Sequence, residues 1–322
     1  MTNIRDIAQL SGYSISTVSR VINHQNYVSD ETRVAIQKVI NQLDYVPNAV
    51  ARDLSRGKTF NVGVVLPNSD HPYFTQLVHG IMRAAFATNY RVVLLPSKYN
   101  VTLELQYLQD LRQRAYDALI FTSHGLPLTA LNRYRQYGTI VVCENPHDCP
   151  IPAAYAERLT TYQAAFNLLK QRGFHQIGLL ASRPVAVSAT CQAMVTSYQS
   201  IFHQAPEPEL MRTDVTTPAD AHRSGEYYIA HHLKPDAILT NGDDNAVGLL
   251  RAYHEHNQQP PYLIGQEHQL SGEVLRLPTI DHHFNEVGAK AFDLAVTGQQ
   301  GKIAIASHLI VPSEVESNKD LG

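Results

Sequence analysis

Apolar positions recur at helical spacing in three short stretches near the N-terminus, residues 4–10, 15–22 and 35–43. Each stretch follows a residue that can cap a helix: Asn3, Ser14 and Ser29. Asp6 completes a capping-box-like spacing with Asn3, and Gly12 separates the first two stretches. The pattern predicts two helices joined by a tight glycine turn and a third helix that supports them, which is the helix-turn-helix layout.

The second stretch has an apolar and a polar side. Val18, Val21 and Ile22 are predicted to face inward. The positions left outside are Ile15, Ser16, Thr17, Ser19 and Arg20. In a helix-turn-helix this helix enters the DNA major groove, where short hydroxyls approach phosphates or base edges and an Arg holds guanine through two hydrogen bonds. The alternative is a small helical bundle whose polar face is only solvated.

The segment DYVPNAVARDLSRGKT follows the third predicted helix. It predicts a further helix of about two turns, which Asn48 can cap and Gly57 ends. So short a helix is marginal in water, and its apolar side is too small for a core, so we expect it to fold only with a second copy and DNA. Ala51 would let the two copies approach closely, and Leu54 would wedge between base steps in the minor groove. The alternative is a frayed linker between domains.

Beyond residue 60, apolar runs alternate with amphipathic stretches such as 74–88 and 246–256. Seven runs have the length and composition of buried strands: 60–67, 90–97, 117–123, 139–144, 176–182, 236–242 and 261–267. Near-continuous apolar strands separated by helices predict parallel sheets covered on both faces. The length exceeds one typical domain, so we expect an α/β body of two doubly wound subdomains.

In such sheets a ligand lies beyond the carboxyl ends of the strands. This rule selects a set of candidate contacts: Asn68, Tyr73, Phe74, Ser123, His124, Glu144, Asn145, Ser182, Arg183, Asn241, Asp243, Asp244, Glu267 and His268. Carboxylates, amides and rings around one cleft suit a polyhydroxylated ligand. The alternative for each residue is a solvated loop position, and Asp243 and Asp244 could instead cap a helix.

Composition narrows the class of protein. The chain has 322 residues, 44% hydrophobic and 17% charged, with neither a membrane-spanning run nor the apolar region of a signal peptide. Three cysteines give no disulfide framework, which favours the cytoplasm. The net charge of −3 argues against a uniformly basic DNA-binding chain, but residues 1–58 hold seven Lys or Arg against five Asp or Glu. A mildly basic N-terminal region on an acidic body fits local contact with phosphates.

Metal and catalytic motifs are weak or missing from the sequence. Cys143, His147 and Cys149 lie close together, and His282 and His283 form a pair, but a zinc site usually needs four ligands at other spacings. The sequence contains no GxSxG, Walker loop or HExxH motif. We therefore expect no metal, no cofactor and no enzymatic activity.

The segments STVSRVIN, VSDETR and YVPNAVARDL together resemble the LacI/GalR family of transcriptional repressors. The resemblance is dense from residue 4 to about 67 and looser to about 316. It implies that Ile15, Ser16 and Arg20 contact base edges and that Leu54 is the minor-groove lever. It also implies a set of phosphate-positioning residues: Thr17, Ser19, Asn23, Ser29, Thr32 and Asn48. The implied body is periplasmic-binding-protein-like, and the chain crosses between its subdomains three times.

The sequence departs from the family in the cleft. Where the family commonly carries an Arg that grips the effector, this chain has Gln192 or Met194, depending on the alignment. Thr160 replaces a common Asp, and Glu144 and Glu267 stand where Asp is usual. Because a buried anion needs a positive partner, these changes predict a neutral sugar or glycoside rather than an anionic effector. A vestigial pocket, with control by a protein corepressor or with no control, stays open.

The resemblance implies a homodimeric repressor of carbohydrate-related genes on a pseudo-palindromic operator. The expected divisions are a helix-turn-helix domain (1–46), a hinge helix and linker (47–59) and a ligand-binding and dimerisation domain (60–322). The last divides into subdomains at roughly 60–158 plus 285–305 and 159–284 plus 306–316. The alternative from another class is a cytoplasmic sugar-binding or enzymatic protein whose N-terminal module binds proteins. The expected partners are operator DNA, a second copy and a sugar or corepressor, without a membrane.

Overall fold

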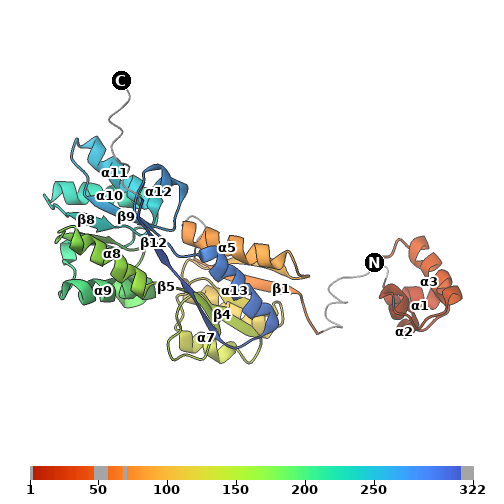
Figure 1. Cartoon of the computed structure of the whole chain (residues 1–322). Coiled ribbons are helices and arrows are strands. Elements are labelled where there is room, and N and C mark those ends of the chain that lie inside the picture. Colours follow the sequence, from red (N-terminus) through yellow and green to blue (C-terminus); the bar gives the residue numbers. More distant parts are fainter. Residues whose placement is uncertain (1–2, 47–56, 68–70, 313–322) are drawn as a thin grey trace, which may run out of the picture. The chain divides into compact units, whose positions relative to one another are not determined.

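The computed structural model describes residues 3–46, 57–67 and 71–312. The chain forms two compact units, Met1–Thr59 and Phe60–Gly322, called here the head and the body (Figure 1). Four predicted contact residues lie outside the described residues: Asn48, Ala51, Leu54 and Asn68. Among the described helices, none combines the length and the apolar character that crossing a membrane requires.

The described part of the head holds three helices, α1 (Ile4–Ser11), α2 (Ile15–Ile22) and α3 (Asp30–Gln42). The three predicted caps are confirmed, since Asn3, Ser14 and Ser29 each accept a hydrogen bond from a backbone N–H in the following turn. Asn3 and Asp6 form a capping box, and Gly12 ends α1 with a left-handed φ of 75°. The helices enclose a small core of Ile7, Ala8, Val18, Val21 and Ile36.

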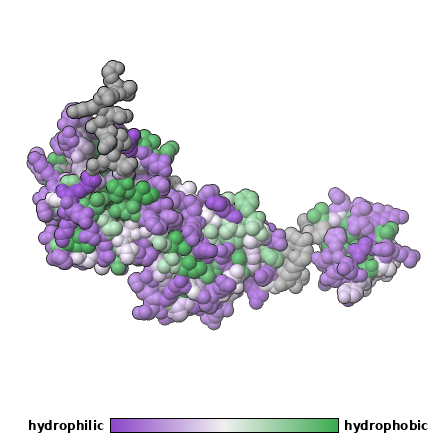
Figure 2. Space-filling model, in the orientation of Figure 1, coloured by the Kyte–Doolittle hydropathy of each residue, from purple (hydrophilic) through white to green (hydrophobic). Residues whose placement is uncertain are grey.

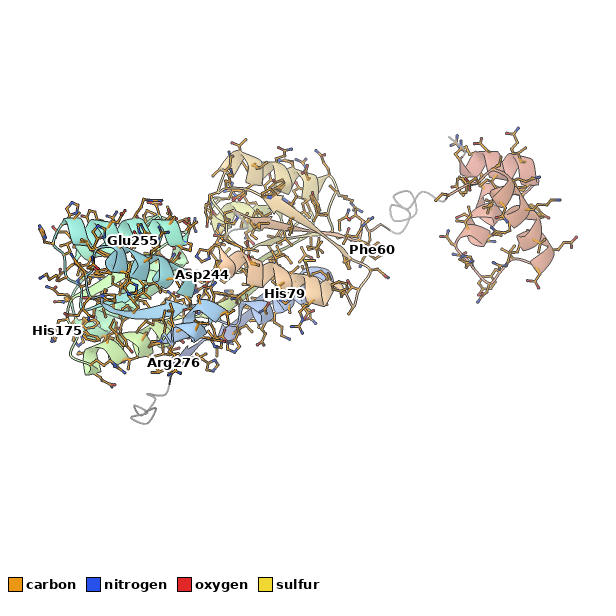
Figure 3. All side chains as sticks on the ribbon, turned by 90° about the horizontal axis from the view of Figure 1, so that it is seen from above. Phe60, His79, His175, Asp244, Glu255 and Arg276 are labelled. Carbon is orange, nitrogen blue, oxygen red and sulfur yellow. The ribbon has the colours of Figure 1, made fainter. Side chains whose placement is uncertain are left out.

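Two six-stranded sheets form the body, one in each of two subdomains (Figures 1 and 3). The first sheet contains β1 (Asn61–Leu66), β2 (Arg91–Pro96), β3 (Ala118–Phe121), β4 (Thr139–Val142), β5 (Ala153–Glu157) and β11 (Lys302–Ala306). These strands are all parallel, in the order β11-β5-β4-β3-β1-β2. This sheet and the helices that cover it are called the first subdomain.

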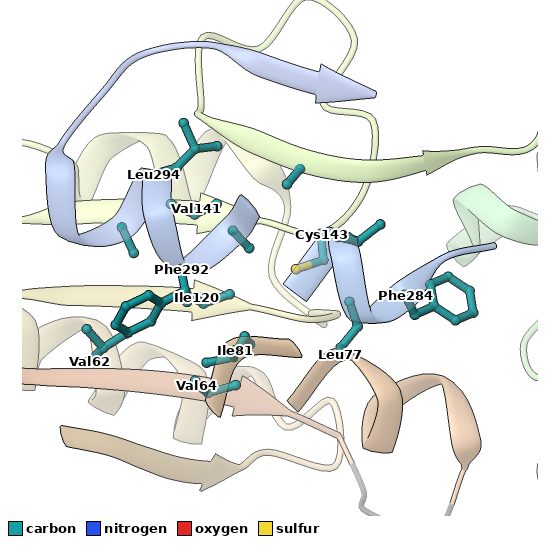
Figure 4. Packing of buried hydrophobic residues seen from close by; sticks show 14 of the residues in the cluster. Val62, Val64, Leu77, Ile81, Ile120, Val141, Cys143, Phe284, Phe292 and Leu294 are labelled. Carbon is teal, nitrogen blue, oxygen red and sulfur yellow. The ribbon is translucent and has the colours of Figure 1, made fainter. Parts of the chain in front are cut away.

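Helices cover both faces of the first sheet. Helices α5 (Pro72–Ala85) and α13 (Phe284–Thr297) pack on one face, around Val62 and Val64 of β1 (Figure 4). Helices α6 (Val101–Arg112) and α7 (Leu128–Tyr134) pack on the other, where Val65 points. Glycines let α5 and α13 meet backbone to backbone, because a Cβ on Gly80 would lie 1.9 Å from the carbonyl oxygen of Asn285.

The second sheet contains β6 (Ile177–Leu180), β7 (Met211–Arg212), β8 (Ala237–Leu239), β9 (Tyr262–Gln266), β10 (Thr279–Asp281) and β12 (His308–Ile310). Its order is β12-β10-β9-β8-β6-β7, and only β12 runs antiparallel to its neighbour. Helices α8 (Leu159–Gln171) and α9 (Ala189–Phe202) pack on one face, and α10 (Pro218–Ala230) and α11 (Asp243–Glu255) on the other. Short elements complete this second subdomain: η1 (Val185–Val187), η2 (Pro208–Leu210) and α12 (Leu270–Val274).

All seven predicted strands are present, as β1 to β4, β6, β8 and β9. The chain passes between the sheets three times, at Arg158, at residues 282–283 and at Ser307. The α/β class with two mostly parallel sheets is therefore confirmed, as is the number of passages that the resemblance implied. On the face shown in Figure 2, hydrophilic side chains cover most of both units and hydrophobic ones are interspersed among them.

Candidate DNA-binding surface and ligand cavity

Helix α2 presents to solvent the residues that the pattern predicted for DNA. Val18 and Val21 are buried on its inner side. Ile15 is 47% exposed, and Ser16 and Arg20 are also exposed. The Arg20 side chain makes no hydrogen bond or ion pair with another described residue, so its guanidinium is available to an outside acceptor. The outer side of α2 thus carries the chemistry needed to contact a DNA groove.

Local hydrogen bonds hold the predicted phosphate contacts in place. The Ser14 hydroxyl lies 2.8 Å from that of Ser16 and 2.9 Å from that of Thr17. Asn23 donates from Nδ2 to the carbonyl of Ser19 at 2.8 Å. At the start of α3 the hydroxyl of Ser29 donates to Thr32 Oγ1 at 2.9 Å. These side chains are fixed by their own backbone segments, which limits the conformational entropy that they would lose on binding.

A cavity of about 470 Å³ lies where the carboxyl ends of strands from both subdomains meet. The lining includes eleven of the candidate residues: Tyr73, Phe74, Ser123, Glu144, Asn145, Ser182, Arg183, Gln192, Met194, Asn241 and Glu267. Gln192 is exposed and donates to the carbonyl of Val185 at 2.9 Å, whereas Met194 is 2% exposed and belongs to the core under α9. The cavity has the size and mixed polarity of a small-molecule site.

Asp243 is not part of the lining. It is fully buried, and its carboxylate accepts hydrogen bonds from the Gln269 backbone and from Thr279 Oγ1, both at 2.7 Å. Asp244 in turn accepts from Ser271 Oγ at 2.6 Å. Neither residue is the capping residue of α11, which is Gly242. The two carboxylates hold the segment after β9 against the start of α11, a structural role that spacing alone did not reveal.

Glu267 is the most deeply buried carboxyl in the lining, at 5% exposure, and its Oε2 has no hydrogen-bond partner. Burial raises its pKa well above the usual range, although the charge of Arg158 opposes the shift. His71 Nδ1 lies 3.5 Å from Glu267 Oε1, but burial and Arg158 together lower the pKa of His71 to about 4. The Tyr73 backbone N–H also donates to His71 Nδ1, and a ring nitrogen can accept a hydrogen bond only when it carries no proton. We therefore regard His71 and Glu267 as a neutral contact rather than an ion pair.

Glu144 and His124 behave in the opposite way. His124 Nε2 lies 3.0 Å from Glu144 Oε1. Burial alone would lower the pKa of His124, but the hydrogen bond and the charge of Glu144 outweigh it, so that pKa is raised. Burial would raise the pKa of Glu144, and His124 and Arg183 outweigh it, so that pKa is lowered. This carboxylate is ionised and already has a partner on the cavity wall.

Two arginines line the cavity, Arg158 and Arg183. The cavity therefore offers positive partners for an anion, although the sequence favoured a neutral ligand. On α9 the family's Arg is replaced by the uncharged Gln192 or Met194. The positive charge of the cavity comes instead from Arg158, at the first passage between the sheets, and from Arg183, in the loop after β6. Arg183 was among the residues singled out after a strand, whereas Arg158 was missed. Arg158 follows the alanine-rich strand β5, whose pattern was too weak to draw attention to its carboxyl end.

Comparisons with known proteins agree along nearly the whole chain. A family model described as bacterial regulatory proteins, lacI family, matches residues 3–48. A second, described as periplasmic binding proteins and sugar binding domain of LacI family, matches residues 59–298. The chain belongs to the LacI family. It is therefore a DNA-binding transcriptional regulator and not an enzyme, as the sequence predicted.

Several LacI-family relatives align over most of the chain. Catabolite control protein B of Bacillus subtilis is 36% identical over 95% of this chain and 97% of its own length. The ribose operon repressor of Escherichia coli is 26% identical over 92% of each chain. The structure of the lac repressor dimer bound to operator and the anti-inducer ONPF is similar with a TM-score of 0.79, at 21% identity, over 96% of this chain and 97% of that one. At that identity the structural likeness establishes the fold alone. The relation to sugar-operon repressors comes from membership of the family.

Among the described residues of this LacI-family chain, no three His, Cys, Asp or Glu side chains gather as the ligands of a metal ion would. Cys143 lines the cavity but is buried, and burial raises the pKa of its thiol to about 12. The chemistry of the cavity is therefore that of hydrogen bonding, aromatic contact and the two guanidinium groups.

Proposed function

We propose that the chain is a homodimeric repressor of carbohydrate-related genes whose affinity for a pseudo-palindromic operator changes when a small ligand occupies the cavity. The observation that carries the DNA-binding half is the outer side of α2, where Arg20 is exposed and unpaired beside fixed hydroxyls. A twofold pair of such heads would match two half-sites about one helical turn apart. The predicted hinge segment, 47–59, lies largely outside the described residues.

The ligand half of the proposal is supported by how the cavity joins the subdomains. Tyr73 and Glu144 come from the first subdomain, and Arg158 and Glu267 from the second or its border. A molecule that contacts both walls binds better to one angle between the subdomains than to another, and that difference is all that it needs to shift their equilibrium. The ribose operon repressor among the relatives and a transcriptional regulator CelR-cellobiose complex among the structural neighbours favour a sugar-like ligand.

The DNA-binding half is tested by selecting genomic fragments with the purified chain and measuring their affinity by fluorescence polarisation at fixed salt. Specific binding should survive competitor DNA and should require a fragment with twofold symmetry. A strictly monomeric chain with no preference for any duplex would contradict the proposal. If operator binding holds but no small molecule alters it, control by a protein corepressor takes the place of the ligand.

A further inference from the structure

The two cavity arginines are held by aromatic rings. The Arg158 guanidinium carbon lies 5.8 Å from the ring centroid of Tyr73 and 5.1 Å from that of Phe284. The Arg183 guanidinium carbon lies 4.1 Å from the ring centroid of Tyr99. A ring face stabilises a cation and restricts the planar guanidinium, while leaving its N–H groups able to donate.

Neither arginine has a charged partner among the described residues, since no carboxylate lies within 4.0 Å of either. Arg183 donates only to neutral oxygens, the carbonyl of His124 and the hydroxyl of Ser123, each at a long 3.4 Å. Its side chain therefore reaches from the second subdomain to the first, where its charge helps to lower the pKa of Glu144 without a direct ion pair. Half-buried cations without partners are costly, so the arrangement is one that an anion would stabilise.

The carboxyl groups that line the cavity do not form ion pairs with the two arginines. Glu144 is paired with His124. Glu157 accepts a hydrogen bond from the Leu159 backbone at 2.9 Å and another from the Thr160 hydroxyl, so it is held at the start of α8. Glu267 is buried, and burial raises its pKa well above the usual range, although the charge of Arg158 opposes the shift. None of these three carboxyl groups lies within 4.0 Å of either guanidinium group.

We propose that the cavity takes a polyhydroxylated ligand that carries an anionic group, a phosphate or a carboxylate, and that Arg158 binds this group while Arg183 supplies the second positive charge. The inference rests on the proposed function of the cavity as an effector site and reverses the neutral ligand that the sequence favoured. Arg158 lies at the first passage between the sheets, so an anion bound there contacts a segment that joins the two subdomains.

Calorimetry on the full chain with matched probes tests the charge. Glucose is compared with glucose 6-phosphate and with gluconate, and ribose with ribose 5-phosphate. At least one anionic probe should bind roughly ten- to a hundredfold more tightly than its neutral parent, the range expected for hydrogen bonds to a charged group. The phosphate and carboxylate arms separate the two sources of the charge. Equal affinities within every pair, or no binding by any anionic probe, overturn the inference.

Substitutions of Arg158 and Arg183 test whether these residues cause the preference for an anionic ligand. Arg158→Gln should remove most of the preference for the anionic member of the pair, and Arg183→Gln should reduce it. Arg251→Gln is the matched control, because Arg251 is exposed on α11 and pairs with Glu255, which is labelled in Figure 3, away from the lining. Arg158→Lys keeps the charge and should retain part of the preference, even if the Gln variant folds poorly. A full preference in folded Arg158→Gln contradicts the role of Arg158.

Operator affinity measured with and without each probe separates this inference from the proposed function. A neutral sugar that binds as tightly as its phosphate and shifts operator affinity would overturn the charge preference and leave the regulator intact. An anionic probe that binds through Arg158 without changing operator affinity would support the charge preference and contradict the effector role.

Discussion

Gln76 of α5 donates from Nε2 to the backbone carbonyl of Glu267, 3.0 Å away. The donor belongs to the first subdomain and the acceptor to the second. Glu267 has a positive φ of 83°, a conformation that non-glycine residues adopt rarely, and its carboxyl lines the cavity. The hydrogen bond therefore links the wall of the cavity to the contact between subdomains.

Removing this link should loosen the subdomain contact. Gln76→Ala should lower the free energy of unfolding of the body by about 1 kcal/mol, because one hydrogen bond to a backbone carbonyl is lost. Urea denaturation followed by fluorescence measures the change. Gln136→Ala is a suitable control, since Gln136 is exposed and bonds only within its own segment, to the Arg133 carbonyl. Equal effects of the two substitutions would show that the link contributes nothing.

Arg20 should supply much of the direct base readout. Arg20→Ala should cost about 1–3 kcal/mol of operator affinity and relax the preference at one base pair. Lys38→Ala on the exposed side of α3 should instead leave sequence preference unchanged. Binding to operators substituted at single positions distinguishes the two outcomes. A variant that discriminates all bases as before would place the readout elsewhere.

The cap of α3 can be tested separately from DNA contact. Ser29→Ala removes the hydroxyl that accepts from the Thr32 backbone N–H, so the head should lose about 0.5–2 kcal/mol of stability. Ser29→Asp restores an acceptor next to the helix dipole and should recover most of the loss. Thermal denaturation followed by circular dichroism provides the comparison. Equal stability of the Ala and Asp variants would rule out the cap.

Glu267 predicts a pH effect on stability. A carboxyl whose folded pKa is raised has no effect while both states are protonated, below about 4.5, and destabilises the fold as pH rises from there toward the folded pKa. Glu267→Gln keeps the shape and removes the titration. The variant should match the parent near pH 4 and exceed its stability near pH 8. A constant difference across that range would contradict a raised pKa for Glu267.

The Glu144 and His124 pair should stabilise the fold at intermediate pH and lose this effect at both higher and lower pH. The raised pKa of His124 contributes stability that is full below the ordinary value of 6.5 and is lost as pH rises through the folded value. The lowered pKa of Glu144 contributes stability above 4.5 that is lost as pH falls through the folded value. His124→Gln should therefore cost most between these limits. Denaturation at pH 5.5 and 9 compares the two regimes, and an equal cost at both would argue against an ion pair.

The sequence correctly predicted the elements that are determined by residues close to one another along the chain. Asn3, Ser14 and Ser29 cap helices through contacts within one turn, so spacing alone was enough to find them. Six of the seven apolar strands are buried along nearly their whole length, which leaves continuous apolar runs, and the seventh, β2, lies at the edge of its sheet and is partly exposed. Strands β5 and β11 were not singled out, because alanine and alternating polar residues weaken that signal.

The site was predicted less completely because it depends on distant parts of the chain. The carboxyl-end rule led to Tyr73, Ser123, Glu144 and Glu267, all of which line the cavity. It also selected Asp243, whose carboxylate is taken up by Thr279 and the Gln269 backbone, segments that spacing does not bring together. Arg158 was missed with its strand, so the sequence analysis did not count its positive charge among the groups that line the cavity.

The order in which the elements occur along the chain has a consequence for biosynthesis. Helix α13 and strand β11 complete the first subdomain, yet they follow the whole second sheet except β12 in the sequence. While a ribosome is still translating β10, the earlier half of the body lacks the helix that covers β1 and the strand that pairs with β5. The two subdomains must therefore complete their folding late in synthesis. Chains that stall before α13 would expose an incompletely covered sheet face to chaperones and proteases.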